Sequence, residues 1–329
     1  MFHKKKKILI FHLGCGSGFY SEYDNMLFAY VYCLMHNIEF KLYSADANFK
    51  IKKGYSDYFI NFCEEVFDDF HSYLNRRQKF PMLTKLYLKK LLYKQPIPSW
   101  VFDKFKPYML KQYIIEPIYK KKYKFDYYTF ELWNKFKSVN PYYHDILYKT
   151  LKLNNKELTF KQLYEEIISL TYKFNNTTKK EIESFISTLN LPTFYIGMHI
   201  RAGDKIKEDK VYDIKNYFDL LRTLSNETSC DNIYVFTDDY SIIKNIKEKY
   251  PTYKIFTLCE TNEQGYDNLL FNQLKPSEKK EKIIKMFANV EILTKSNIFI
   301  GAYNSSPDIF LSLRRKNNSY FIDRKISNY

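Results

Sequence analysis

The chain has 329 residues, of which 45% are hydrophobic and 19% aromatic, and its formal net charge is +15 at pH 7. This composition excludes an intrinsically disordered chain, and the length allows two domains that each bury a hydrophobic core. The positive charge is compatible with a nucleic acid, an anionic membrane surface or an acidic ligand as partner, and by itself it does not choose among them.

The N-terminus and the cysteines bear on the cellular setting. The apolar stretch 8–13 is too short for a signal sequence or a membrane span, so we expect a buried strand there. The five cysteines, an odd number without a CxxC pair or metal-ligand spacing, favour reduced thiols. The sequence therefore predicts a cytoplasmic protein without a transmembrane segment, and the charge leaves peripheral contact with a membrane open.

The first 43 residues predict a β-loop-α-β unit. It consists of a strand at 6–11, a turn at 14–18, a helix at about 24–36 and a strand at 39–43. Glycines in the turn, Gly16 and Gly18 among them, allow the backbone to approach a ligand closely. The turn does not match GxGxxG, because no glycine follows Gly18 until Gly54, and a dinucleotide cofactor is not expected.

The middle of the chain, residues 58–172, predicts mostly helical structure that prolines break into short pieces. Within it, residues 85–124 interleave Leu, Tyr and Ile with Lys. Such a stretch fits a lid, an acceptor-binding surface or a face that contacts a membrane. Solvated helices whose lysine stems cover an apolar core have the same composition and are the commoner explanation.

The second half alternates strands and helices with short connections, which predicts a mostly parallel sheet with helices on both faces. The expected strands are 194–200, 232–237, 253–258, 298–301 and 319–322, and the expected helices are 214–224, 240–249, 277–295 and one after residue 306. We therefore expect an α/β protein with two domains, 1–190 and 191–329. Ligands of such sheets bind beyond the carboxyl ends of the strands, where polar residues become candidates for a site.

The strand at 194–200 runs into a cluster of charged side chains that contains His199, Arg201, Asp204 and Lys205. Breaking a sugar–phosphate bond leaves negative charge on the β-phosphate, which a guanidinium fork neutralises through paired hydrogen bonds. Arg201 is the candidate for this task, with Lys205 as a second cation and Asp204 as a residue that orients either one. A structural ion-pair network, with His199 as a structural group, is the alternative for the same cluster.

The next strand ends in Asp238 and Asp239. Asp239 is expected to cap the following helix, and Asp238 to reach a ribose or to support the basic cluster. A rival interpretation takes both carboxylates as manganese ligands of a single-domain, metal-dependent glycosyltransferase. Arg201 and Lys205 would make that metal redundant, so no metal is predicted.

A third strand, at 298–301, leads into Ser305, Ser306 and Pro307. Ser306 is expected to be a helix N-cap and Pro307 the first helical residue. The amide groups and hydroxyls of Ser305 and Ser306 would then face a phosphate at the positive end of the helix. The same tripeptide is also common as a simple cap, so its place after a third strand carries the prediction.

These three ordered motifs resemble those of the α1,6-/α1,2-/protein O-fucosyltransferase superfamily. The hallmark H-x-R-x-G/T-D-K corresponds to residues 199–205, the T-D-D block to 237–239 and the Ser-rich turn to 301–306. The glycine turn, with the Asn-Met-Leu of 25–27, is similar to the glycine loop of the family with a short insertion. The resemblance spans residues 8–45 and 193–322.

The resemblance implies a GT-B fold, in which two Rossmann-like domains face each other across a cleft. It also implies an inverting, metal-independent transfer of fucose from GDP-fucose to a hydroxyl of a glycan or a protein. In this family Arg201 would bind phosphate, His199 would contact the guanine side, and Ser305 would contact the β-phosphate. Asp204 and Lys205 would support them.

Two further positions are assigned by the same resemblance. Asn289 falls where the α1,6 branch has an aspartate that recognises guanine. Asp209 matches a carboxylate of that branch and is preferred over Glu208 as general base. The chain departs from the branch at Ala202, where a second arginine is expected, and near Ser306, where a glutamine is expected.

Other functions stay open at this stage. One is a glycosyltransferase that uses another nucleotide sugar, and another is a non-catalytic protein that binds a sugar nucleotide or an anionic surface. Nucleic acid is not expected as a partner, because no RNP-like, KH-like or zinc-finger signature is present.

Overall fold

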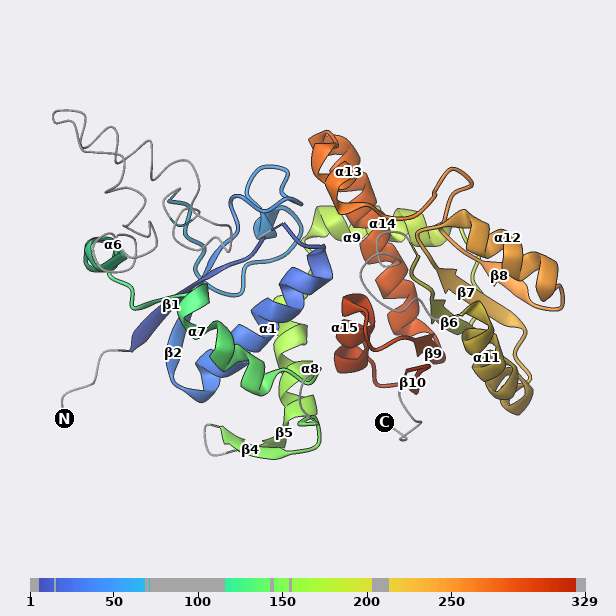
Figure 1. Ribbon diagram of the computed structural model, residues 1–329, viewed down its shortest axis with the longest axis horizontal. Helices are drawn as coiled ribbons and strands as arrows, with labels where there is room; N and C mark the ends of the chain where they lie inside the picture. Colours follow the sequence, from blue (N-terminus) through green and yellow to red (C-terminus); the bar gives the residue numbers. More distant parts are fainter. Residues whose placement is uncertain are drawn as a thin grey trace, which may run out of the picture.

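The structure is a computed structural model that describes residues 6–14, 16–68, 71, 116–142, 145–153, 156–202 and 213–323. It consists of two α/β halves that lie side by side along the longest axis, each built on a parallel sheet (Figure 1). The predicted fold class is therefore confirmed. No helix in these ranges combines the length and the apolar character that crossing a bilayer requires.

The N-terminal sheet has the strand order β2-β1-β3. Its central strand β1 (Lys7–His12) pairs in parallel with β2 (Ile38–Tyr43) and with the short β3 (Tyr127–Tyr128). Strand β1 is buried almost throughout, because helices cover both faces of a parallel sheet and an apolar run such as ILIF suits that position. The strands at 6–11 and 39–43 predicted from the sequence are confirmed.

Helix α1 (Phe19–Met35) begins about five residues earlier than predicted. Gly18 is its N-cap, and the Glu22 carboxylate in the first turn accepts hydrogen bonds from the backbone amides of Gly14 and Ser17, at 3.2 and 3.0 Å. A carboxylate there satisfies amide groups of the preceding turn and suits the positive end of the helix. The glycine turn and the start of α1 are thus one connected unit.

The prediction of a mostly helical middle is wrong for part of the described chain. Its described helical elements are α6 (Glu116–Tyr123), α7 (Thr129–Phe136), η3 (Lys137–Val139) and α8 (Phe160–Thr171), and the short η1 (Tyr55–Asp57) precedes it. Strand β3 and the antiparallel hairpin of β4 (Thr150–Leu153) and β5 (Lys156–Thr159) were missed. Two-residue and four-residue strands are too short for periodicity to identify. Most of the lysine-rich stretch 85–124 lies outside the described residues.

The C-terminal sheet is parallel throughout, with the order β10-β9-β6-β7-β8. Its strands are β6 (Ile196–His199), β7 (Asn232–Phe236), β8 (Lys254–Phe256), β9 (Ile298–Gly301) and β10 (Ser319–Phe321). All five were predicted. Because β6 lies between β7 and β9, the three strands whose ends carry the sequence motifs are direct neighbours.

The helices of this half also follow the predicted order. They are α11 (Ile214–Thr228), α12 (Tyr240–Lys249), α13 (Asn268–Gln273), α14 (Pro276–Lys295) and α15 (Ser306–Arg314). Asp239 is the N-cap of α12, as predicted, and its carboxylate accepts a hydrogen bond from the Ser241 amide at 2.8 Å. The short α13 was missed.

The predicted cap of α15 is wrong by one residue. Ser305 is the N-cap, Ser306 is the first helical residue and Pro307 the second. The Ser305 carbonyl accepts hydrogen bonds from the amides of Asp308 and Ile309, which starts the helix one position earlier. Proline is accepted in the first turn because no intrahelical partner exists for its missing N–H.

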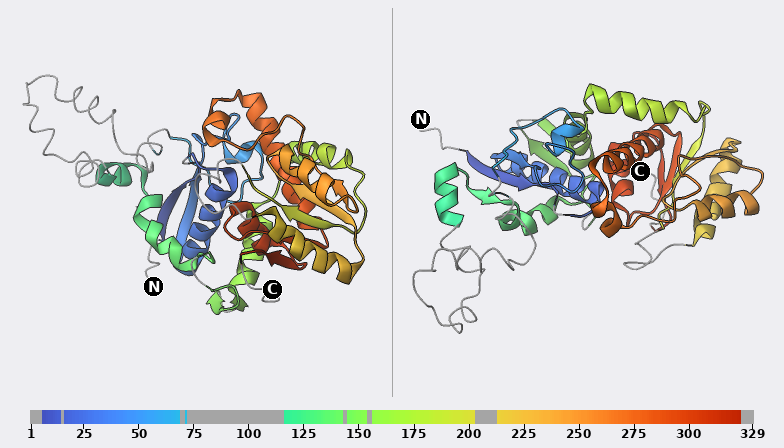
Figure 2. Two further views of the ribbon diagram at one scale, coloured as in Figure 1. Left: turned by 45° about the vertical axis from the view of Figure 1, so that its right-hand side comes forward. Right: turned by 90° about the horizontal axis from the view of Figure 1, so that it is seen from above.

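The two halves share a hydrophobic core beneath their junction. Helix α1 packs against α8 and α15, and α9 (Asn176–Ser187) packs against α14 (Figure 2). Aromatic rings join the halves directly: the Phe19 and Phe287 centroids lie 4.9 Å apart and those of Tyr172 and Phe310 lie 4.7 Å apart. The domain boundary at residue 190 stays a prediction.

Candidate active site

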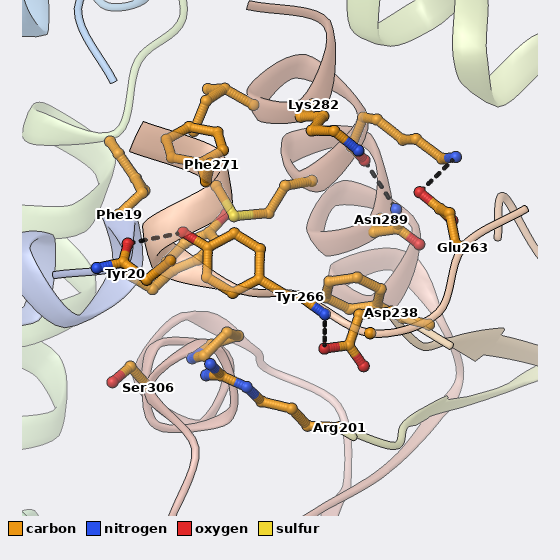
Figure 3. Close-up of a pocket in the computed structure, with 18 of the residues that line it drawn as sticks. Phe19, Tyr20, Arg201, Asp238, Glu263, Tyr266, Phe271, Lys282, Asn289 and Ser306 are labelled. Atoms are coloured by element: carbon orange, nitrogen blue, oxygen red, sulfur yellow. Dashed lines mark hydrogen bonds and ion pairs between the residues drawn. The ribbon is translucent and has the colours of Figure 1, made fainter. Parts of the chain in front are cut away.

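A cleft of about 600 Å³ lies where the two halves meet (Figure 3). The N-terminal half contributes the glycine turn, the start of α1 and the loop after β2, and the C-terminal half contributes strand ends, the loop 260–266 and α14. The predicted site residues that line it are Gly16, Gly18, His199, Arg201, Asp238, Asn289 and Ser306. Residues far apart in the sequence thus converge on one cavity.

Other predicted site residues do not appear in this lining. Ser305 is buried beside it, 3% exposed, and its Oγ has no hydrogen-bond partner among the described residues. Asp204, Lys205 and Asp209 lie outside the described residues, as does Glu208. Their assigned roles remain predictions.

Arg201 is positioned by contacts of the residues next to it. The Ala202 amide donates a hydrogen bond to Asp238 Oδ1 at 2.9 Å, and the Tyr266 amide donates to Asp238 Oδ2 at 3.0 Å. The guanidinium carbon of Arg201 lies 6.0 Å from the ring centroid of Tyr266, a cation–π distance. Asp238 therefore connects the arginine segment to the loop that carries Tyr266, which favours a supporting role over ribose binding.

His199 is held on two sides. Its Nδ1–H donates a hydrogen bond to Asp308 Oδ1 at 2.6 Å, and its ring stacks on Phe236 with centroids 4.4 Å apart. Asp308 Oδ2 accepts from the Ala302 amide at 2.8 Å. Burial raises the pKa of the Asp308 carboxyl, and the neighbouring His199 partly offsets this. Only Nε2 of His199 then remains for a ligand.

The N-terminal end of α15 lies at the same part of the cleft. Figure 3 shows the Arg201 side chain extending toward Ser306, the first residue of the helix. The helix dipole favours an anion there, although Pro307 has no N–H and the Asp308 and Ile309 amides donate to the Ser305 carbonyl. A guanidinium fork beside this helix end makes an anion site suited to a phosphate group.

Asn289 lies on α14, across the cleft from Arg201 and Ser306 (Figure 3), and is 3% exposed. Its Nδ2 donates to the Lys285 carbonyl at 2.8 Å, and its Oδ1 accepts from the Tyr234 hydroxyl at 2.7 Å. The side chain thus lines the cavity while both ends of its amide already have partners.

The loop before α13, together with α13 and α14, adds residues that the sequence did not single out. Lys285 Nζ lies 2.9 Å from Glu260 Oε1 and 3.2 Å from Glu263 Oε1. Tyr266 faces Arg201, and Phe271 and Met286 add apolar surface. Glu260, Glu263 and Tyr266 lie in the loop that follows the carboxyl end of β8, and this position is the sequence signal that pointed to them.

Hydrogen bonds also connect the two walls of the cleft. Asn268 Nδ2 donates to the Gly16 carbonyl at 2.7 Å, and Asn48 Nδ2 donates to Asn272 Oδ1 at 3.1 Å. Gly16 has a φ of 100°, a conformation that glycine adopts without strain. The prediction that this turn approaches the site is consistent with its place in the lining.

In the described part of the chain, no three His, Cys, Asp or Glu side chains lie together as metal ligands could. Arg201 and the start of α15 at Ser306 supply the positive charge at the anion site. Such a site binds an anion through fixed positive charge.

The chain is similar to known proteins in part of its sequence and in its fold. Residues 148–266 match the family model "Alpha-(1,6)-fucosyltransferase N- and catalytic domains". A structure of POFUT1 in complex with GDP-fucose has a TM-score of 0.50 at 10% identity, covering 98% of this chain and 99% of that chain. POFUT1 in complex with GDP has a TM-score of 0.51 at 10% identity, covering 97% and 99%. The fucosyltransferase NodZ from Bradyrhizobium has a TM-score of 0.47 at 11% identity, covering 95% and 94%.

The structure has a GT-B-like fold, in which two Rossmann-like halves face a shared cavity. The matched family is the one that the sequence motifs resemble. The family match covers 148–266, which contains the arginine motif and the T-D-D block.

Proposed function

We propose that the protein transfers fucose from GDP-fucose to a hydroxyl of a glycan or protein acceptor, with inversion and without a metal ion. One observation carries this: Arg201 and the N-terminal end of α15 at Ser306 line the same cleft. The family match supports the reaction class, and a neighbour of the same fold is in complex with GDP-fucose. A cytoplasmic location stays a prediction.

The chemistry follows from the charge that develops on the leaving group. As the sugar–phosphate bond breaks, the β-phosphate gains negative charge, which Arg201 and the positive end of α15 at Ser306 stabilise in place of a metal. Asp204 and Lys205 would support Arg201, and Asp209 would accept the proton of the attacking hydroxyl as general base. Gly16 and Gly18, which line the cleft from the N-terminal half, leave room for the substrate on that side.

Arg201→Lys is the direct test of this proposal. A point charge does not replace a bidentate fork, so we expect the release of GDP from GDP-fucose to fall by about 100-fold or more. Arg222→Lys is the matched control, because Arg222 is an exposed arginine of α11 whose side chain is 63% exposed. Activity of Arg201→Lys equal to that of the control would exclude the role assigned to Arg201.

Ligand binding separates this function from its alternatives. GDP should raise the melting temperature, whereas an oligonucleotide should not, because only a ligand of the native state stabilises it. Transfer should persist in a chelator such as EDTA. Stabilisation by UDP or dTDP, with none by GDP, would assign the site to another nucleotide sugar.

A further inference from the structure

The side-chain amide of Asn289 already makes two hydrogen bonds, which leaves it few groups with which to bind a nucleobase. Only its nitrogen can donate to the Lys285 carbonyl, so the orientation of the amide is determined and its oxygen must be the atom that accepts from the Tyr234 hydroxyl. Tyr234 is fully buried, which makes the loss of this hydrogen bond costly. One N–H of Asn289 remains, and it suits a carbonyl acceptor.

The edge of guanine that carries N1, N2 and O6 presents both hydrogen-bond donors and an acceptor. Its N1–H and N2–H₂ are donors that require an acceptor, and a carboxylate accepts from both at once. Asp238 lines the cleft, but its carboxylate already has a supporting role, because it joins the Arg201 segment to the loop of Tyr266 by accepting from the amides of Ala202 and Tyr266. Within the described part of the lining, the remaining carboxylates are those of Glu260 and Glu263.

Glu263 is the better organised of these two. Its side chain is 23% exposed, compared with 61% for Glu260. Its Oε2 accepts from the Glu260 amide at 3.0 Å while Oε1 contacts Lys285, so the carboxylate is held from two directions. Each of its oxygens keeps a second lone pair with which it can accept from a ligand. Figure 3 shows Glu263 next to Asn289 on the same wall. A fixed, partly desolvated carboxylate discriminates between ligands more strongly than a solvated one.

We propose that Glu263 is the residue that determines base specificity, by accepting hydrogen bonds from N1–H and N2–H₂ of guanine. The remaining N–H of Asn289 donates to O6 beside it. This assignment rests on the proposed use of a guanine nucleotide. Lys285 contacts the carboxylates of both Glu260 and Glu263 and so fixes the position of Glu263. Glu263 takes over the task of the aspartate that is absent at position 289.

Binding of GDP, IDP and 1-methyl-GDP by calorimetry tests the proposal. IDP lacks the 2-amino group and 1-methyl-GDP lacks N1–H, so the wild type should bind each about 10-fold or more weakly than GDP, the worth of one hydrogen bond to a charged group. Glu263→Gln should bind GDP about 10- to 100-fold more weakly and should no longer prefer GDP over IDP.

Glu260→Gln is the matched control, because it removes the other carboxylate that contacts Lys285. It should keep the preference of the wild type for GDP over IDP. A Glu263→Gln protein that keeps this preference would overturn the inference. So would a wild type that binds 1-methyl-GDP as tightly as GDP, a measurement that does not depend on folding of a variant. Absence of GDP binding in the wild type would instead refute the proposed function, and the inference with it.

Discussion

Replacing Asp308 tests whether the His199 contact organises the cleft. Asp308 is 1% exposed, and its two oxygens accept from His199 Nδ1 and from the Ala302 amide. Asp308→Ala leaves both donors buried and without this acceptor. Each unsatisfied group costs about 1–3 kcal/mol, so the expected loss is about 2–6 kcal/mol. Domains have stabilities of about 5–15 kcal/mol, which makes this loss readily measurable.

Asp308→Asn separates the two contacts. Its amide oxygen accepts from one donor while its NH₂ group faces the other, so we expect roughly half the loss of Asp308→Ala. The assay is urea unfolding, with GDP affinity measured in parallel because an unanchored His199 no longer presents Nε2 in a fixed direction. Destabilisation that leaves GDP affinity unchanged would place His199 outside the ligand site.

Glu278→Ala provides the control for the helix dipole. Glu278 is also an acidic residue in the first turn of its helix, α14, where its carboxylate accepts from the Lys275 amide at 2.9 Å, but no histidine contacts it. Its removal should cost about 0.5–2 kcal/mol, the usual worth of such a cap. If Asp308→Ala costs no more than Glu278→Ala, the buried His199–Asp308 pair has no special energetic role.

Two further predictions follow from buried groups and from the contacts between the walls. Burial raises the pKa of Asp24 well above its usual value, and neither carboxylate oxygen has a hydrogen-bond partner among the described residues. The folded state accommodates the neutral carboxyl better than the charged one. The stability that goes with the neutral form is therefore fully present below about pH 4 and is lost as the pH rises through the folded-state pKa of Asp24. Asp24→Asn should be more stable than the wild type at pH 8, with a difference in urea unfolding that shrinks toward pH 4; a constant difference would contradict the assignment. Asn268→Ala removes the 2.7 Å hydrogen bond to the Gly16 carbonyl, and we expect GDP affinity to fall by about 3- to 10-fold, whereas unchanged affinity and dissociation rate would show that this bond does not hold the cleft.

Part of the site could be predicted because local patterns locate strand ends. Apolar runs ending at His199, Phe236 and Gly301 are strands β6, β7 and β9, and in a parallel sheet polar residues after such runs share one edge. This is why Arg201 and Asp238 line one cavity. Boundaries were less certain, because the start of α1 depends on Glu22 contacting Gly14 and Ser17.

The sequence by itself determined the α/β class, the five C-terminal strands and the basic, hydroxyl-bearing residues at their ends, since these depend on near-neighbour patterns of hydrophobicity. Only the tertiary structure decided which side chains share partners. The His199–Asp308 pair spans 109 residues and the Tyr234–Asn289 pair spans 55, so no local period encodes either. Such distant contacts decide which donors and acceptors of a side chain remain for a ligand. The sequence therefore could not predict which groups of Asn289 can bind a nucleobase.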